Sequence, residues 1–298
     1  MTAPYAWQND CWQHFVALKA QQKLPHAVLL TGAPYTGKWD FSQACAQALL
    51  GVDAANLALC QSADGHPDHL NIVPESDKMP VVKIDQIRQV KHFLAETAQR
   101  GGFRVVCIRQ AECMNTAAAN ALLKTLEEPG QQVLILLVSA RPAVLPATIL
   151  SRCQRWLMRV TFAEARAYLQ QHASEYTPEA SWQLSQGQPL RFALETERQY
   201  VQEKAQFLAV DILTQSPLQL AKQYEAVPLP VVVEWLFAKA VQTLQMPGLK
   251  TISQQALFHF LDHLYQAQRD LQKSVHVNPL LFLEDLLIEQ QRVYHACR

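Results

Sequence analysis

One stretch near the N-terminus, residues 26–38, restricts the possible folds more than any other part of this sequence. "HAVLL" is an apolar run typical of a buried strand, and "TGAPYTGK" is a glycine-rich loop. An amphipathic pattern follows, in which Phe41, Cys45 and Leu49 share one face of a helix that Gly51 ends. A strand, a glycine loop and a helix in this order begin a βαβ unit, which requires a parallel sheet with helices on its faces.

The rest of the pattern divides the chain into an α/β part and an all-helical part. Further buried strands are predicted at residues 70–73, 104–108 and 132–139, and helices at 83–98 and 116–128. Short helices are expected from Thr161, and only helical patterns occur from about residue 197. We therefore expect an α/β domain with a parallel sheet over 1–160, a small helical lid domain over 161–199 and a helical C-terminal domain over 200–298.

The glycine loop keeps the pattern of a phosphate site but lacks one metal ligand. Gly32, Gly37 and Lys38 match G-x-x-x-x-G-K-[ST], in which backbone amides and the lysine hold phosphate oxygens. Trp39 stands where that pattern requires a hydroxyl that helps to hold Mg²⁺. Nucleotide binding by Gly32, Gly37 and Lys38 is therefore expected to be weak or absent.

The strand predicted at 104–108 lacks the second metal element. Phosphoryl-transfer enzymes of this architecture place an aspartate after that strand, often followed by a glutamate that activates water. Arg109 and Gln110 occupy these places here. An arginine ~4 Å from a divalent ion would cost roughly 8 kcal/mol at an effective dielectric near 20. Because both metal elements fail independently, we do not expect ATP hydrolysis at this site.

Composition excludes several other classes of function. The 26 basic and 26 acidic residues balance, which argues against nucleic-acid binding through a general positive field. Seven cysteines without a C-x-x-C pair argue against disulfides and a four-cysteine zinc site, so we expect reduced thiols, no zinc and a cytoplasmic protein. "GHPDH" offers His66, Asp68 and His69 to a metal, but a turn is the favoured interpretation. The six tryptophans are scattered, as core and interface residues are.

Three stretches together resemble the AAA+ clamp-loader family. They are "LPHAVLLTGAPYTGK" (24–38), "NTAAANALLKTLEEPG" (115–130) and "PATILSRCQ" (146–154), in that family's order and spacing. "NPLLFLEDLLIE" (278–289) is similar to the end of the family's C-terminal collar domain. The resemblance implies an AAA+ fold with a degenerate phosphate loop, a lid and a collar that joins subunits into a ring. It also implies a task in replication, namely loading the sliding clamp on primed DNA.

Ser151, Arg152 and Cys153 reproduce the family's S-R-C motif letter for letter. In the family this motif supplies an arginine finger to the ATP site of the neighbouring subunit. A guanidinium presents the forked donors that γ-phosphate oxygens need. The resemblance therefore implies that Arg152 acts in trans on ATP bound by a partner, and an ordinary surface ion pair is the alternative.

The resemblance also implies that Lys124 lies near the DNA duplex in the assembled loader, although a solvated lysine is equally compatible with the sequence.

Two features depart from the family's pattern, and a third agrees with it. Many relatives carry a four-cysteine zinc module in the interval 46–65, where this chain has only Cys60. Arg191 comes one place later than the lid's nucleotide-sensing arginine, which makes a nucleotide-sensing role doubtful, and a helix arginine that faces solvent is the alternative. Ser139 occupies the place of the family's polar sensor.

The favoured hypothesis is a stator subunit that keeps the ATPase fold without hydrolysing ATP. It would require no cofactor of its own and would work in a ring with gamma/tau and delta subunits, among which the motor subunits bind ATP. A self-sufficient AAA+ ATPase of the gamma/tau type is the alternative. A stand-alone DNA-binding AAA+ relative is a third, which the balanced charge disfavours. ATP turnover by the purified chain would separate the first two.

Overall fold

The computed structural model describes residues 3–51, 66–75, 80–99, 102–245, 251–272 and 278–297. The chain divides into two compact units, Met1–Glu197 and Arg198–Arg298. The first unit contains a sheet and helices, and the described part of the second is helical. Each unit has hydrophobic core clusters of its own, as an independent domain requires.

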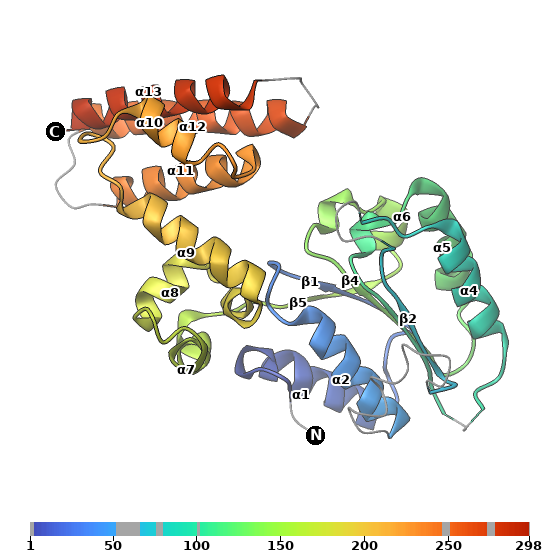
Figure 1. The fold of residues 1–298 in the computed structure, drawn as a ribbon. Coiled ribbons are helices and arrows are strands. Elements are labelled where there is room, and N and C mark those ends of the chain that lie inside the picture. The colour runs from blue at the N-terminus through green and yellow to red at the C-terminus, as the bar shows by residue number, and fades with distance from the viewer. Residues whose placement is uncertain are drawn as a thin grey trace. The chain divides into compact units, whose positions relative to one another are not determined.

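Five parallel strands form the sheet of the first unit, in the order β2-β3-β4-β1-β5 (Figure 1). The strands are β1 (Ala27–Thr31), β2 (His69–Ile72), β3 (Arg104–Ile108), β4 (Val133–Val138) and β5 (Gln154–Leu157). The three central strands, β1, β3 and β4, are buried along their whole length. Burial on both faces is typical of parallel sheets and confirms the α/β class expected from the sequence.

Two helical layers cover the sheet (Figure 1). One layer consists of α1 (Asn9–Ala20) and α2 (Lys38–Leu50), and the other of α4 (Ile84–Ala95), α5 (Thr116–Glu127) and α6 (Ala147–Leu150). Phe15, Phe41 and Cys45 are buried between the first layer and the sheet, and Leu122 and Ile149 between the second layer and the sheet. The inward face predicted for α2 is thereby confirmed.

The helix α5 forms where its sequence predicts it. The side chain of Asn115 accepts a hydrogen bond from the N–H of Ala118 at 2.8 Å, so Asn115 caps the helix. Ala118 and Ala119 are buried, and their small side chains let α5 lie close to the sheet. The helix ends at Glu127, two residues before Pro129, which cannot donate to the helical ladder.

The lid segment of the first unit is helical as expected. It contains α7 (Phe162–His172), α8 (Pro178–Leu184) and the 3-10 helix η5 (Pro189–Ala193). Thr161 and Glu164 form a capping box at the start of α7, and Thr177 caps α8. The described residues of the unit also contain the short 3-10 helices η1 (Ala6–Gln8), η3 (Ala111–Cys113) and η4 (Pro142–Val144).

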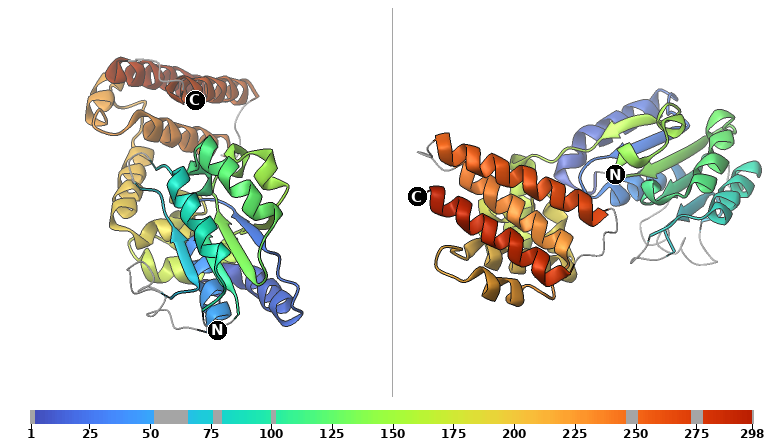
Figure 2. Two further views of the ribbon diagram at one scale, coloured as in Figure 1. Left: turned by 90° about the vertical axis from the view of Figure 1, so that its right-hand side faces the viewer. Right: turned by 90° about the horizontal axis from the view of Figure 1, so that it is seen from above.

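The second unit contains helices only among its described residues, in agreement with the sequence. They are α9 (Glu195–Ala209), which begins in the first unit, α10 (Pro217–Gln223), α11 (Leu229–Leu244), α12 (Thr251–Gln272) and α13 (Pro279–Cys297). α12 packs between α11 and α13, and Figure 2 shows α12 and α13 side by side. Trp235, Phe260 and Leu287 are fully buried in this core. The division into 1–160, 161–199 and 200–298 stays a prediction.

None of the helices described here has the length and apolar character needed to cross a membrane.

Candidate functional site

A pocket of about 490 Å³ lies over the glycine loop, at the carboxyl ends of the parallel strands. It is lined by the glycine loop and the start of α2, by the segments that follow β3 and β4, and by Tyr5. Leu190, Ala193 and Leu194 of the lid segment complete its wall. Open parallel sheets bind their ligands at this edge, so this pocket is the candidate site.

The glycine loop folds around the ammonium group of Lys38. Lys38 Nζ donates to the carbonyl of Gly32 at 3.0 Å, to the carbonyl of Ala33 and to Thr36 Oγ1 at 3.4 Å. Only 6% of the Lys38 residue is exposed. This burial lowers the pKa of Lys38 to about 8, against the opposing effect of the Glu112 carboxylate. The donors of the lysine thus bind the loop's own oxygens.

The segment before α1 lies against the same loop. Trp7 Nε1 donates to the carbonyl of Thr36 at 3.0 Å, and Gln8 Nε2 donates to the carbonyl of Gly37 at 2.8 Å. Gly37 has a φ of 76°, and a Cβ atom added there would lie 2.5 Å from the ring of Tyr5. Only glycine fits both the left-handed backbone and this close approach. The loop conformation is therefore fixed from outside as well as by Lys38.

The two metal-binding positions carry neither a hydroxyl nor a carboxylate. Trp39 lines the pocket, and its side chain packs against the core beneath α2. Arg109 and Gln110 line the pocket after β3, at the places expected from the sequence. The indole and the guanidinium both disfavour a divalent cation, one because it has no oxygen and the other because of its charge.

Two acidic residues reach the pocket elsewhere. Asp40 Oδ2 accepts a hydrogen bond from the Tyr5 hydroxyl at 3.1 Å, and Glu112 Oε1 accepts one from the N–H of Ala140 at 3.1 Å. Across the described part of the chain, no group of three His, Cys, Asp or Glu residues is placed to hold a metal ion. These carboxylates also oppose a bound triphosphate, because they carry the same sign of charge.

Arg191 is buried, which corrects the expectation that it faces solvent. Only 9% of this residue is exposed. Its Cζ lies 5.2 Å from the centre of the Tyr35 ring, and Nη1 lies 3.7 Å from Glu197 Oε2. Its Nε donates to Gln188 Oε1 at 2.9 Å. Sequence spacing alone missed this because η5 folds back on the loop, where the N–H of Leu190 donates to the Tyr35 carbonyl at 3.2 Å.

Arg152 lies in the turn that follows α6, and a third of its side chain is exposed. Nη2 forms an ion pair with Glu127 of α5, and Nη1 donates to the carbonyl of Thr148 at 2.9 Å and to Ser151 Oγ at 3.2 Å. Cys153 packs against the core, and its burial raises the pKa of the thiol to about 12. The motif therefore presents an ordered guanidinium at the surface and an unreactive thiol beneath it.

Ser139 and Lys124 have the surroundings of ordinary structural and surface residues. Ser139 is fully buried at the end of β4, and its hydroxyl accepts a hydrogen bond from the N–H of Arg141 at 3.1 Å. Lys124 is exposed on α5. The roles suggested for both by the resemblance stay predictions.

Comparison with known proteins identifies the family. A family model described as "DNA polymerase III, delta subunit" matches residues 7–161. The DNA polymerase III subunit delta′ of Haemophilus influenzae is 33% identical to this chain, over 80% of this chain and 76% of that protein. The chain belongs to the DNA polymerase III delta′ family. The subunit delta′ of Pseudomonas aeruginosa is 29% identical over 96% of both chains, and the resemblance inferred from the sequence is confirmed.

A solved structure has the same architecture as this delta′-family chain. The DNA polymerase III gamma subunit-related protein of Thermotoga maritima matches it with a TM-score of 0.55 at 20% identity, over 93% of this chain and 98% of that chain. The likeness concerns the fold alone. It agrees with the parallel sheet and the helical C-terminal region described above.

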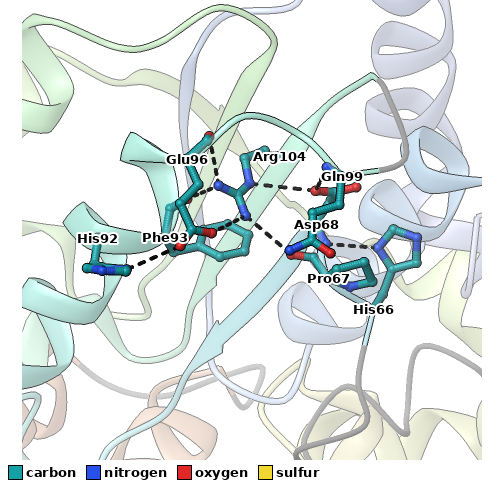
Figure 3. Close-up of polar contacts among 8 residues, drawn as sticks. All are labelled: His66, Pro67, Asp68, His92, Phe93, Glu96, Gln99 and Arg104. Carbon is teal, nitrogen blue, oxygen red and sulfur yellow. Dashed lines mark hydrogen bonds and ion pairs between the residues drawn. The ribbon is translucent and has the colours of Figure 1, made fainter.

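The H-P-D phrase of the delta′-family chain forms the turn that the sequence favoured. The N–H of His69 donates to the carbonyl of His66 at 3.0 Å, and the Asp68 carboxylate accepts from the N–H of Gln99 at 2.8 Å. The guanidinium of Arg104 lies beside this carboxylate, with Nε 3.7 Å from Oδ1 (Figure 3). Asp68 and Arg104 are almost completely buried, so the turn is anchored to β3.

Arg104 also binds the end of α4. It donates to the carbonyl of Phe93 and, at 2.8 Å, to that of Glu96, and its Cζ lies 4.1 Å from the centre of the Phe93 ring (Figure 3). These contacts join β3, α4 and the turn. Asp68, which the sequence suggested as a metal ligand, therefore has a structural role. Cys60 lies outside the described residues, so the predicted lack of a zinc module in the delta′-family chain stays a prediction.

Tyr5, Tyr35, Asp40 and Glu127 were not identified from the sequence as parts of either site. Tyr35 and Asp40 flank Lys38, so proximity to the loop was the available signal. Nothing in the sequence relates Tyr5 to Asp40 or Glu127 to Arg152, because each pair meets only in the folded delta′-family chain.

Proposed function

We propose that this chain is a stator subunit of the DNA polymerase III clamp loader, which helps to place the sliding clamp on primed DNA without hydrolysing ATP itself. Membership of the delta′ family supports the assignment to this complex. The observation that carries the proposal is the lining of the pocket. Trp39, Arg109 and Gln110 stand where an ATPase needs a hydroxyl, a metal-binding aspartate and a water-activating glutamate.

The state of Lys38 supports the same conclusion. A lysine that stabilises phosphate must direct its ammonium group toward the phosphate oxygens. Here that group is bound to carbonyls of its own loop and is desolvated, which weakens its positive charge near pH 8. Turning Lys38 toward a ligand would break these hydrogen bonds.

Arg152 is the residue through which the chain would contribute to catalysis. Its guanidinium is partly exposed and remote in sequence from the pocket, and Glu127 and Thr148 hold it in one orientation. An ordered, forked donor at the surface suits the γ-phosphate of ATP in a neighbouring subunit. We assign Arg152 this role in trans, with Ser151 and Cys153 supporting its position.

The partners that follow from the proposal are gamma/tau and delta subunits, which would form the ring together with this chain. The second unit would supply the contacts. Phe258 and Tyr265 of α12 are more than half exposed and stand seven residues apart, so they fall on one face of that helix. An apolar helix face suits association that does not depend on a nucleotide.

Reconstitution with the partner subunits tests the proposal. The purified chain should hydrolyse no ATP. In the complex, Arg152→Ala should lower ATP hydrolysis while leaving assembly intact, because an exposed arginine adds little stability. Arginine fingers are worth about 10³–10⁵ in rate at their own site, and several sites in one complex dilute the loss. Arg152→Lys should rescue poorly, since an ammonium has no planar fork.

Two control variants make the experiment decisive. Arg155→Ala removes an exposed arginine three residues away, on β5, and should have no effect. Lys38→Ala should leave the complex active if the home site binds no nucleotide. A complex that Lys38→Ala disables and Arg152→Ala leaves unchanged would contradict the proposal and favour the self-sufficient ATPase.

A further inference from the structure

The lid segment of the first unit is attached to the glycine loop by a side chain of the loop itself. The Tyr35 hydroxyl donates to Glu197 Oε1 at 2.5 Å, and the Tyr35 ring lies beside the guanidinium of Arg191. Arg191 and Glu197 pair with each other, and the Tyr35 carbonyl accepts the N–H of Leu190. One residue of the loop thus contacts three residues of the lid and its following helix.

The backbone at Tyr35 indicates that these contacts hold it in place. Its φ is 53°, in the left-handed region that non-glycine residues enter at a cost of about 1–2 kcal/mol. Such a conformation persists only where its surroundings stabilise it. Burial and the Glu197 carboxylate raise the pKa of Tyr35 to about 12, so the hydroxyl stays protonated at neutral pH and can donate the hydrogen bond to Glu197.

A second attachment joins the other side of the lid segment to the same loop. The ring of Tyr168 on α7 meets the rings of Tyr5 and Trp7 edge to face, with centroids 6.0 and 5.5 Å apart. Trp7 in turn donates to the carbonyl of Thr36 in the loop. The lid segment is therefore anchored at α7 and at η5, and both anchors end on the glycine loop.

We infer that Tyr35 acts as a built-in clasp, which holds the lid segment on the glycine loop without a bound nucleotide. The pocket is lined by both the loop and the lid segment, so a ligand there would bridge the two. Tyr35 makes that bridge within the chain. A ligand shifts a conformational equilibrium only if it binds the two conformations with different affinities. A nucleotide would therefore change the position of the lid segment little, because Tyr35 already holds that segment on the loop. If the chain is a stator, as proposed, the clasp would give its first unit a fixed shape. Only this consequence of the clasp rests on the proposed function.

Hydrogen exchange of the full-length chain tests the clasp directly. Tyr35→Phe keeps the ring and removes the hydroxyl. The amides of residue 188 and of residues 190–193 should then exchange at least about tenfold faster, which is the lower end of the effect expected for one hydrogen bond to a carboxylate. Tyr35→Asn should accelerate them further, although asparagine tolerates the left-handed backbone better than tyrosine does. Tyr176→Phe is the matched control in the same lid segment, and it should leave these amides unchanged. Millimolar Mg·ATP should not alter the exchange of residues 161–197 in the unmodified chain.

Two results would overturn the inference. One is exchange at residues 188–193 that stays the same in Tyr35→Phe and Tyr35→Asn. The other is protection of the lid segment by Mg·ATP in the unmodified chain. The near-UV circular dichroism spectrum of each variant checks that the chain has folded, and Tyr35→Phe is conservative enough to serve if Tyr35→Asn fails that check. The test is independent of Arg152, because a silent Arg152→Ala in the complex would refute the finger and leave the clasp intact.

Discussion

The buried ammonium group of Lys38 should make the stability of the first unit depend on pH in a way that one substitution removes. Lys38→Met keeps the apolar stem and deletes the charge. In the folded chain burial lowers the pKa of Lys38 from 10.5 to about 8. At about 1.4 kcal/mol for each pH unit, holding this lysine protonated in the folded state at neutral pH costs on the order of 3 kcal/mol. Its hydrogen bonds to Gly32 and Ala33 offset this cost by stabilising the folded chain by about 1 kcal/mol each.

The direction of the pH effect follows from proton binding. Below about pH 8 the lysine is protonated in both the folded and the unfolded chain, so the full cost is present. Between about pH 8 and 10.5 the unfolded chain binds more protons, and stability contributed by this site therefore rises with pH. Relative to the unmodified chain, Lys38→Met should be more stable by about 1 kcal/mol at pH 7 and less stable by about 1 kcal/mol at pH 9.5.

Urea unfolding at these two pH values measures the difference. Tryptophan fluorescence reports mainly on the first unit, which contains all of the tryptophans except Trp235. Lys124→Met on α5 is the matched control, and its effect should be equal at both pH values because Lys124 is exposed. A Lys38→Met chain whose stability differs from that of the unmodified chain by the same amount at pH 7 and pH 9.5 would refute the reasoning.

Two further predictions concern the framework around the site, and both are measured by urea unfolding. Arg104→Met should lower the free energy of unfolding by about 3–5 kcal/mol, because it leaves the buried Asp68 carboxylate without its cation. Arg88→Met, which breaks an exposed ion pair, is the control and should change the free energy of unfolding by less than about 1 kcal/mol. Asn115→Ala should cost about 1 kcal/mol through the lost cap of α5, and Thr116→Ala should cost less; equal losses would mean that the cap is not provided by Asn115.

The sheet could be predicted because its strands are buried on both faces and the helices between them carry strong periodicity. The strand expected at 104–108 was placed without error, and those at 70–73 and 132–139 were placed within one residue at each end. Helix α1 and strand β5 were not predicted. β5 is an edge strand with a single buried side chain, that of Trp156, so it has little of the apolar pattern that reveals a central strand.

The chemistry of the candidate site was only partly accessible to the sequence. The substitutions at the metal-binding positions can be read directly from the sequence, because the motif fixes where those positions are. The contacts that decide how the site behaves are pairs far apart in the chain, such as Tyr35 with Glu197. Arg191 illustrates the limit, because a shift of one residue suggested a solvent-facing side chain. The actual side chain is buried between the loop and the end of the lid segment.

The glycine loop retains two features that cost stability, and a purely vestigial site does not explain them. The buried ammonium of Lys38 and the left-handed backbone of Tyr35 are both unfavourable, and substitutions that relieve such costs are easily found. Each feature also makes contacts that fix the loop: Lys38 binds its carbonyls and Tyr35 binds the lid segment. A loop that must keep one shape without a ligand needs such internal partners, because no phosphate would then organise it. If the chain is a stator, as proposed, Lys38 and Tyr35 would therefore give it the rigidity that this role requires.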